Sequence, residues 1–202
     1  SLALNKPADS VSDLSFEYNT QQTSSQTGGN CVEFYTSYFS DFQRIYTYGG
    51  ARHWWIPQVN DQGTGQNGMF SNSFMTLRGL GATIGYMHLQ GYIGYSTGSV
   101  FNNVYFNNKV GSILAMTGAA VYVDLCDEIV FNQLNIEDVD LSLSGATDKI
   151  LWLAARNTVI NGLHFERCKM GSSGSAPVLV SGSSGDATAV INGLTVSYSE
   201  FP

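Results

Sequence analysis

A pattern of apolar and polar positions recurs along the second half of the chain. It reads apolar, apolar, Asn, any residue, apolar, any residue, apolar, and four segments fit it without gaps. Phe101, Phe131, Ile160 and Ile191 hold the same place in the pattern and follow one another at steps of 30, 29 and 31 along the sequence. A fixed period of this size indicates a repeat architecture. The four segments are 100–106, 130–136, 159–165 and 190–196.

Weaker copies extend the period towards the N-terminus. Residues 11–16 fit with Ser12 in the Asn position, residues 39–42 fit more loosely, and residues 70–74 fit with one residue extra. From Val11 the steps are 28 to Phe39, 31 to Phe70 and 31 to Phe101. About seven units of this length then account for nearly the whole chain. We expect rungs near 11–38, 39–69, 70–100, 101–130, 131–159, 160–190 and 191–201.

Each unit also contains a second short apolar run. These runs are β-branched or aromatic and are bounded by Gly, Ser, Asn and Asp, which is typical of β-strands. No segment shows a sustained period of 3.6 residues, so helices should be minor. The second runs are 32–34, 54–56, 92–95, 121–123, 151–153 and 178–180.

Two or three short strands cannot bury their own apolar face, but stacked copies can. The sequence therefore predicts a single all-β domain over residues 1–202, a right-handed single-stranded parallel β-helix with equivalent residues about 4.8 Å apart. The Asn position is expected to be a corner, because Asn tolerates a left-handed backbone. Stacked amides would then form an Asn ladder. The alternative is ordinary turn asparagines in a β-sandwich. The ladder residues are Asn102, Asn132, Asn161 and Asn192.

Composition excludes some classes of protein. The 202 residues are 43% hydrophobic and 12% charged, which argues against intrinsic disorder. Nine Lys and Arg against 16 Asp and Glu give a net charge of −7, the wrong sign for a protein that binds duplex nucleic acid. No stretch approaches the roughly 18–20 apolar residues of a membrane span, so we expect no membrane insertion. Residues 1–7 do not resemble a signal peptide.

The cysteines predict neither a metal site nor a redox site. Cys31, Cys126 and Cys168 are odd in number, far apart in sequence, and form no C-x-x-C pair. We expect three buried thiols that fill apolar space. We also expect no cofactor and no bound metal.

The stacked units with an Asn corner resemble the right-handed parallel β-helix proteins of the pectin-lyase-like type. That group includes single-chain polysaccharide lyases and hydrolases, and trimeric bacteriophage tailspikes. The resemblance covers residues 11–201. The Ser, Thr, Asn and Gly content, the few lysines and the lack of an amphipathic capping helix favour the tailspike branch. The resemblance implies a homotrimeric fragment of a longer virion-tail protein, extracellular, which binds bacterial surface polysaccharide (capsule or O-antigen) during host attachment.

The period also places charged residues in register. Glu137 and Glu166 are one period apart, so they should stack as like charges. Carboxyl groups about 5–5.5 Å apart form the catalytic pair of retaining glycosidases, and mutual repulsion would raise one pKa. If the chain is an enzyme, we therefore expect a glycoside hydrolase more than a polysaccharide lyase. The alternative is that both side chains point into water beside Arg167, which neutralises them.

The resemblance to phage depolymerases makes Asp127 and Glu128 the second candidates for a catalytic pair. Alternating charges form two further expected stacks, Asp138 on Arg167 and Asp127 on Arg156, which suit a solvent-facing column. The two arginines are also candidates for substrate binding. No run of carboxylates spans three consecutive units, so a calcium-dependent lyase is not expected.

Residues 52–55 are the densest aromatic cluster and the main candidate for sugar contact. The indoles of Trp54 and Trp55 suit stacking on sugar rings, and Arg52 and His53 suit an anionic sugar. Strand alternation should place one indole in the core and the other outside. His164 is expected to be an isolated, exposed strand residue without a catalytic role.

Two other functions compete with the tailspike hypothesis. One is a monomeric secreted polysaccharide hydrolase or lyase of the same fold. The other is a non-catalytic β-helical stalk or adhesin module.

Overall fold

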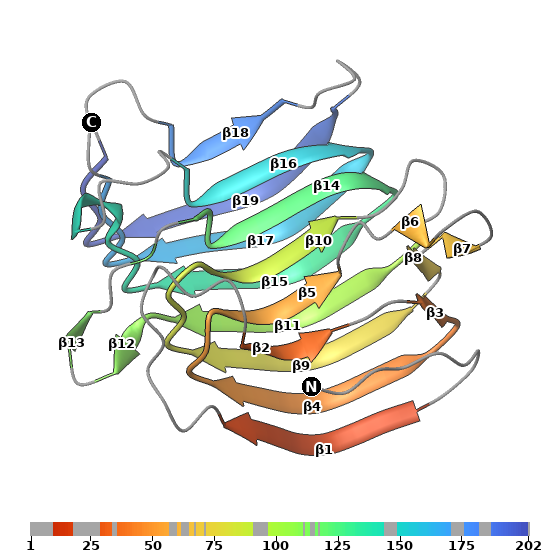
Figure 1. Ribbon diagram of the computed structural model, residues 1–202. Coiled ribbons are helices and arrows are strands. Elements are labelled where there is room, and N and C mark those ends of the chain that lie inside the picture. Colours follow the sequence, from red (N-terminus) through yellow and green to blue (C-terminus); the bar gives the residue numbers. More distant parts are fainter. Residues whose placement is uncertain are drawn as a thin grey trace.

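Two parallel sheets extend along the molecule, and the chain alternates between them as it winds (Figure 1). The computed structural model describes residues 10–17, 29–33, 36–56, 60–61, 65–66, 68–70, 72–90, 97–110, 112–113, 116, 118–143, 149–170, 176–181 and 187–201. The predicted all-β parallel solenoid, with stacked coils of about 30 residues, is confirmed.

The long sheet has seven strands, all paired in parallel. In order they are β1 (Ser10–Glu17), β4 (Asp41–Tyr48), β9 (Ser73–Leu80), β11 (Val100–Asn107), β15 (Val130–Glu137), β17 (Thr158–Glu166) and β19 (Ala189–Ser197).

The second sheet has six parallel strands. They are β2 (Asn30–Glu33), β5 (Arg52–Ile56), β10 (Gly85–Gln90), β14 (Val121–Asp127), β16 (Leu151–Arg156) and β18 (Val178–Val180). The third of these differs from the expected strand at 92–95, because β10 ends at Gln90. Residues 92–95 lie outside the described residues.

A coil is fully enclosed when both of its strands have neighbours on either side. Roughly four coils meet this condition, those of β4 and β5, β9 and β10, β11 and β14, and β15 and β16. The coils that contain β1, β18 and β19 are incomplete, because one of their strands lies at the edge of a sheet. The expected number of about seven equivalent rungs was therefore too high.

The second and third units are aligned differently from the sequence prediction, whereas the first unit, with Ser12 in the Asn position, is aligned as predicted. In the long sheet Val11 pairs with Phe42, which pairs with Phe74, which in turn is in register with Phe101. Phe39 and Phe70, which the prediction placed in this column, lie three and four residues earlier. The steps along this column are therefore 31, 32 and 27, and the loops between strands absorb the variation.

The interior of the solenoid is built from columns of equivalent apolar residues. Phe42, Phe74, Phe101 and Phe131 stack with ring centroids 4.7, 4.4 and 4.9 Å apart. Offset-stacked rings at such spacing add to the free energy gained by apolar burial. The coil spacing of the parallel sheet thus sets the ring spacing, and four inward aromatic positions form one continuous stack.

The Asn ladder is confirmed, but its residues are not the left-handed corner. Side-chain amides of Asn132, Asn161 and Asn192 each donate to the preceding Asn oxygen, at 2.8, 2.8 and 2.9 Å. The positive φ angles fall one position later, at 53° for Asn103, 63° for Gln133, and at glycines in the last two coils. The residue after each Asn therefore adopts the left-handed conformation, and the Asn side chains form hydrogen bonds between neighbouring coils beside it.

Other described elements are small. Strands β3 (Thr36–Tyr38) and β8 (Gly68–Phe70) pair in parallel. Two antiparallel pairs are β6 (Asn60–Asp61) with β7 (Gly65–Gln66), and β12 (Lys109–Val110) with β13 (Ser112–Ile113). The helical content of the described residues is one 3₁₀ turn, η1 (Leu141–Leu143), as expected.

Within the described residues no helix has the length and apolar character needed to span a membrane. The three cysteines are buried and free, which confirms the expectation of filler thiols.

Candidate functional site

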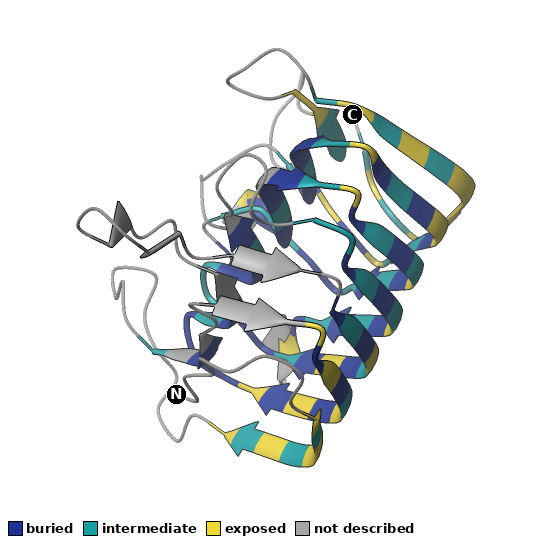
Figure 2. Ribbon diagram, turned by 90° about the vertical axis from the view of Figure 1, so that its right-hand side faces the viewer, coloured by how far each residue is buried: buried dark blue, intermediate teal, exposed yellow. Residues whose placement is uncertain are grey.

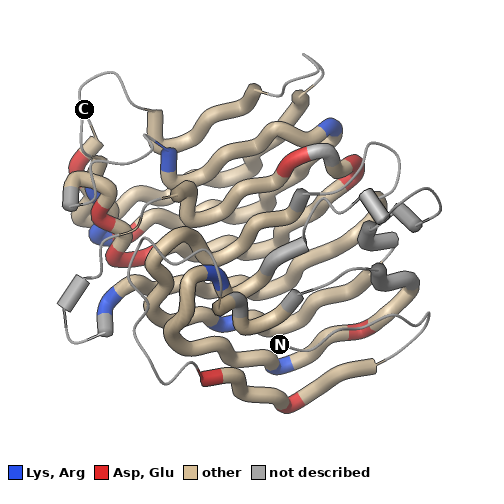
Figure 3. Tube along the Cα trace, in the orientation of Figure 1, with Lys and Arg blue, Asp and Glu red and all other residues tan. Residues whose placement is uncertain are grey.

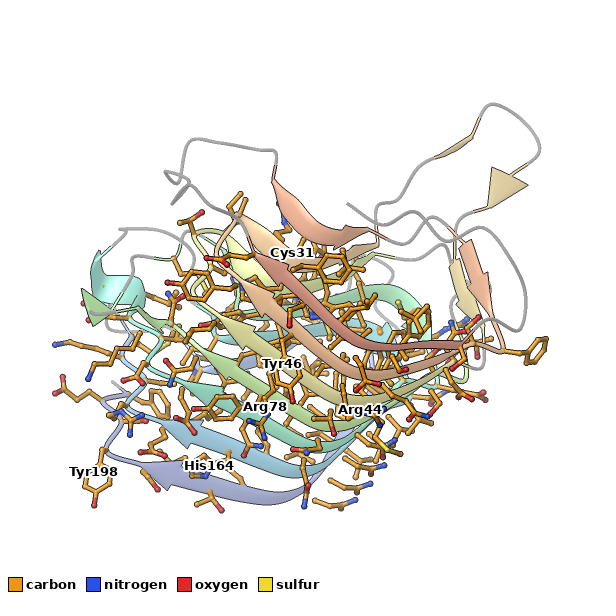
Figure 4. The ribbon with its side chains drawn as sticks, turned by 90° about the horizontal axis from the view of Figure 1, so that it is seen from below. Cys31, Arg44, Tyr46, Arg78, His164 and Tyr198 are labelled. Carbon is orange, nitrogen blue, oxygen red and sulfur yellow. The ribbon has the colours of Figure 1, made fainter. Side chains whose placement is uncertain are left out.

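One row of outward-facing side chains crosses the long sheet. Tyr46 is in register with Arg78, Arg78 with Tyr105, Tyr105 with Asn135, and Asn135 with His164. Figure 4 shows the three labelled members, Tyr46, Arg78 and His164, following one another across the strands. Because side chains alternate along a strand, this row faces solvent while its neighbours on either side point into the core.

Two carboxylates lie next to this row at the ends of their strands. Glu137 and Glu166 are in register on β15 and β17, as predicted. One oxygen of each, together with a ring nitrogen of His164, lies within 4.8 Å of the other two atoms. The Tyr105 hydroxyl donates to Glu137 Oε2 at 2.9 Å. The row and the carboxylate pair are therefore one continuous surface, joined by Tyr105.

Arg167 binds this cluster from the corner that follows β17. Its Nη2 is 3.1 Å from Glu137 Oε2, its Nη1 pairs with Glu166 Oε1, and its Nε donates to Asp138 Oδ1 at 2.8 Å. The Asp138 side chain is only 2% exposed. The Arg167 guanidinium holds the pKa of Asp138 below its ordinary value of 3.8. The predicted stack of Asp138 on Arg167 is confirmed, and Arg167 neutralises both glutamates as the alternative interpretation expected.

His164 is not isolated, contrary to the sequence prediction. Its Nε2 lies 3.4 Å from Glu166 Oε2, and the side chain is half-buried. The prediction treated this histidine as isolated because its immediate neighbours, Leu163 and Phe165, point inward. Alternate residues of a strand share a face, so Glu166 lies beside His164 on the solvent side.

The glutamates and His164 are residue types that bind divalent cations. Arg167 already pairs with both carboxylates, so a cation would compete with a guanidinium that is bound in place. Nothing in the described part of the chain points to a cation at this position beyond the convergence of these three groups.

A cavity of about 330 Å³ opens on the same face, towards β1. Its walls include Tyr46, Tyr48, Arg78, Leu80 and Tyr105. Tyr46 and Tyr48 are 41% and 37% exposed, so part of each ring is accessible. Small-molecule sites are concave, mostly apolar, and contain a few polar groups. Because Tyr105 lines the cavity and also binds Glu137, the cavity adjoins the carboxylate pair.

The second carboxylate group lies at the opposite end of β15. Asp127 pairs with Arg156 at 3.1 Å and accepts a hydrogen bond from the Asn157 side chain at 3.0 Å. Glu128 is exposed, sits at a corner with φ 53°, and accepts a hydrogen bond from Thr97. The eight-residue strand separates this group from Glu137, on the order of 20 Å. The structure does not bring Asp127, Glu128 or Arg156 together with the Glu137–Glu166 pair.

The cluster at residues 52–55 is mostly inside the solenoid. His53 is completely buried, with Nε2 2.9 Å from the Gly81 carbonyl, and burial lowers its pKa to about 4. Trp54 is also buried, and packs edge-on against Phe74. The prediction that His53 contacts substrate is therefore wrong. The side chain of Trp55 lies outside the described residues.

His53 and Trp54 are successive residues and both are buried, so the inward–outward alternation of a regular strand is interrupted between them. Strand pairing joins Arg52 to Gly85 and Trp54 to Met87, and skips His53. A straight strand would have placed His53 outside, which is what the sequence argument assumed.

The second sheet carries its own aromatic row. His88, Tyr122 and Trp152 follow one another with ring centroids 4.6 and 4.5 Å apart. Together with Arg52 they line a smaller cavity of about 160 Å³. Each ring packs on the next, so the ring faces within the row are largely covered by neighbouring rings.

Charged residues are few on the middle of both sheets and gather at strand ends. Figure 3 shows acidic and basic segments close together on the side of the molecule marked C. Glu137, Glu166 and Arg167 form one such group at the ends of β15 and β17. Sequence reasoning found these charges but missed the tyrosines and Arg78. The signal was present, since Tyr46, Arg78 and Tyr105 follow one another at steps of 32 and 27 along the sequence. The misaligned second and third units concealed it.

In comparisons with known proteins, no family model, no curated protein and no solved structure matches the chain. The fold and the candidate site therefore stand on the geometry of this chain alone.

Proposed function

We propose that the chain binds a polysaccharide along the outer face of its long sheet, and that Glu137 and Glu166 hydrolyse it. The observation that carries this proposal is the cavity lined by Tyr46, Tyr48 and Tyr105 next to two carboxylates in register. Aromatic rings offer flat apolar faces to sugar C–H groups, and phenol hydroxyls bind sugar hydroxyls. A glycan lying across the strands would contact both the rings and the carboxylates.

The surroundings of the two glutamates suit different roles. Glu137 Oε2 accepts hydrogen bonds from Tyr105, Asn107 and Arg167, which fix this carboxylate in place. Glu166 is more exposed, 26% against 13%, and lies beside His164. We assign Glu137 as the fixed nucleophile and Glu166 as the group that protonates the leaving oxygen, as in a retaining glycosidase.

The biological setting follows from the resemblance of the repeat to tailspikes. We propose a bacterial capsule or O-antigen as the polysaccharide, and a homotrimer exposed on a virion tail as the assembly. Parallel β-helices suit this use, because each added coil extends a long outer face at constant geometry.

Binding and cleavage can be tested separately. Purified protein is titrated with a panel of bacterial surface polysaccharides, and reducing ends are counted after incubation. Tyr46→Ala and Tyr48→Ala should each weaken binding about tenfold, since one sugar–ring contact is lost. Glu137→Gln and Glu166→Gln should retain binding and lose at least 100-fold in cleavage rate. Met75→Ala, an exposed long-sheet residue that does not line the cavity, is the matched control.

A non-catalytic glycan-binding stalk is the second candidate, and one observation favours it. Arg167 pairs with Glu137, Asp138 and Glu166 together, so the like charges are already compensated. If the wild-type chain binds a polysaccharide but releases no new reducing ends, the stalk is the correct function.

Sedimentation at micromolar concentration tests the proposed trimer, and a monomer would contradict it.

A further inference from the structure

Arg78 differs from Arg44, Arg156 and Arg167 in having no carboxylate partner among the described residues. Arg44 pairs with Asp13, Arg156 with Asp127, and Arg167 with three carboxylates. Arg78 makes no ion pair with any described residue, although acidic residues outnumber basic ones by 16 to 9 in the whole chain. An exposed guanidinium without a carboxylate partner is available for a ligand.

The surroundings of Arg78 form a binding site and not a flat surface. It lines the 330 Å³ cavity with Tyr46, Tyr48 and Tyr105, and no acidic residue is part of that lining. Its guanidinium lies 5.9 Å from the centre of the Tyr46 ring, so a cation–π contact holds it on one side. Figure 4 shows Arg78 and Tyr46 projecting from the same face of the long sheet. The planar guanidinium of Arg78, with its hydrogen-bond donors, therefore lies in a cavity with aromatic walls.

We propose that Arg78 binds the carboxylate of an acidic sugar, a hexuronic acid or a similar carboxylated pyranose, within this cavity. The tyrosine walls suit the pyranose ring, and the guanidinium fork matches a carboxylate with two parallel hydrogen bonds. This inference rests on the proposed function and names the class of polysaccharide that the surface takes.

The position of Arg78 also defines where the charged sugar lies. Arg78 on β9 is two strands from Glu137 on β15, roughly 10 Å at the usual strand spacing. The acidic sugar therefore binds beside the carboxylate pair and not on it. This separation matters because Glu137 and Glu166 would repel a sugar carboxylate placed directly between them.

The test compares an acidic glycan with its own neutral form. Uronic-acid-containing bacterial capsule oligosaccharides are titrated before and after chemical reduction of the carboxyl groups to primary alcohols. Wild-type protein should bind the acidic form at least tenfold more tightly than the reduced form. Arg78→Gln should remove this preference, so that the variant binds the acidic and the reduced forms with equal affinity. Arg78→Lys should retain part of it, since a lysine supplies charge without the planar fork.

Arg44→Gln is the matched control, because Arg44 is also exposed on the long sheet but pairs with Asp13 and does not line the cavity. It should leave both affinities unchanged. Equal binding of acidic and reduced glycans by the wild type would overturn the acidic-sugar inference while the proposed function stands. An undiminished preference for the acidic form in Arg78→Gln would also overturn it. No binding of either form, or of neutral glycans, would overturn the proposed function itself.

Discussion

The imidazole of His53 shows how one buried side chain links stability to pH. Burial lowers its pKa from 6.5 to about 4, and the backbone carbonyls of Gly81 and Gly49 oppose this shift only in part. Between these two values the unfolded chain binds a proton that the folded chain excludes. The free energy of unfolding should therefore fall as the pH is lowered from 6.5 towards 4, by about 2–3 kcal/mol at pH 4.5.

Urea unfolding of wild type and His53→Gln at pH 7.5 and pH 4.5 checks this. The decrease between the two pH values should be about 2–3 kcal/mol smaller in the variant. His88, whose pKa is also lowered to about 4 by burial, titrates in both proteins and cancels in the comparison. The same pH dependence in both proteins would contradict the assignment of a neutral, enclosed His53.

At the scale of the strand, the Asn ladder should contribute to stability through its side-chain amides. Asn161 donates to Asn132 at 2.8 Å and accepts from Asn192 at 2.9 Å. Asn161→Ala removes both bonds, and should lower the free energy of unfolding by about 1–2 kcal/mol. Met75→Ala provides the control, because Met75 occupies the same column three coils earlier and has no amide. It should change stability by less than about 0.5 kcal/mol. Similar losses in both variants would show that the column contributes by packing alone.

The same column shows what a sequence can predict about this fold. The spacing of Asn102, Asn132 and Asn161 predicted the parallel coils and their register, since stacking forces equivalent residues into line. The position of the bend was not predictable from the Asn, because the positive φ falls on the next residue. That residue is Asn, Gln or Gly in these coils and Arg44 or Thr76 in earlier ones, so residue type does not identify it.

Part of the candidate site could also be predicted from the sequence, and part could not. The stacking of Glu137 on Glu166 followed from the period of the well-aligned coils. The tyrosine cavity did not, because it is formed by the early coils, where loops of unequal length shift the register by three or four residues. His53 was misplaced for another reason, since His53 and Trp54 are both buried and so break the alternation that the prediction relied on.

At the scale of the whole molecule, stability should vary along the solenoid axis. A repeat protein is held together by interfaces between neighbouring coils, so a coil with one neighbour has about half the stabilising contacts of a coil with two. Leu163 and Leu194 occupy the same column, yet they are 1% and 56% exposed. Figure 2 shows this contrast, with exposed positions spread over β19 and buried positions repeating along the middle coils.

Amide hydrogen exchange measured by mass spectrometry should therefore follow position along the axis. Amides of β11 and β15, which have neighbours on both sides, should exchange slowest. Those of β19 should exchange at least tenfold faster, because its inward residues Leu194 and Val196 are 56% and 45% exposed and opening it costs only one interface. β17 provides the internal comparison, since it has nearly the same sequence pattern but is covered by β19. Equal protection of β17 and β19 would mean that β19 is covered in solution. The proposed trimer, or a further coil of the same kind, would explain such a cover. That result would exclude a stability set only by interfaces between the coils of one chain.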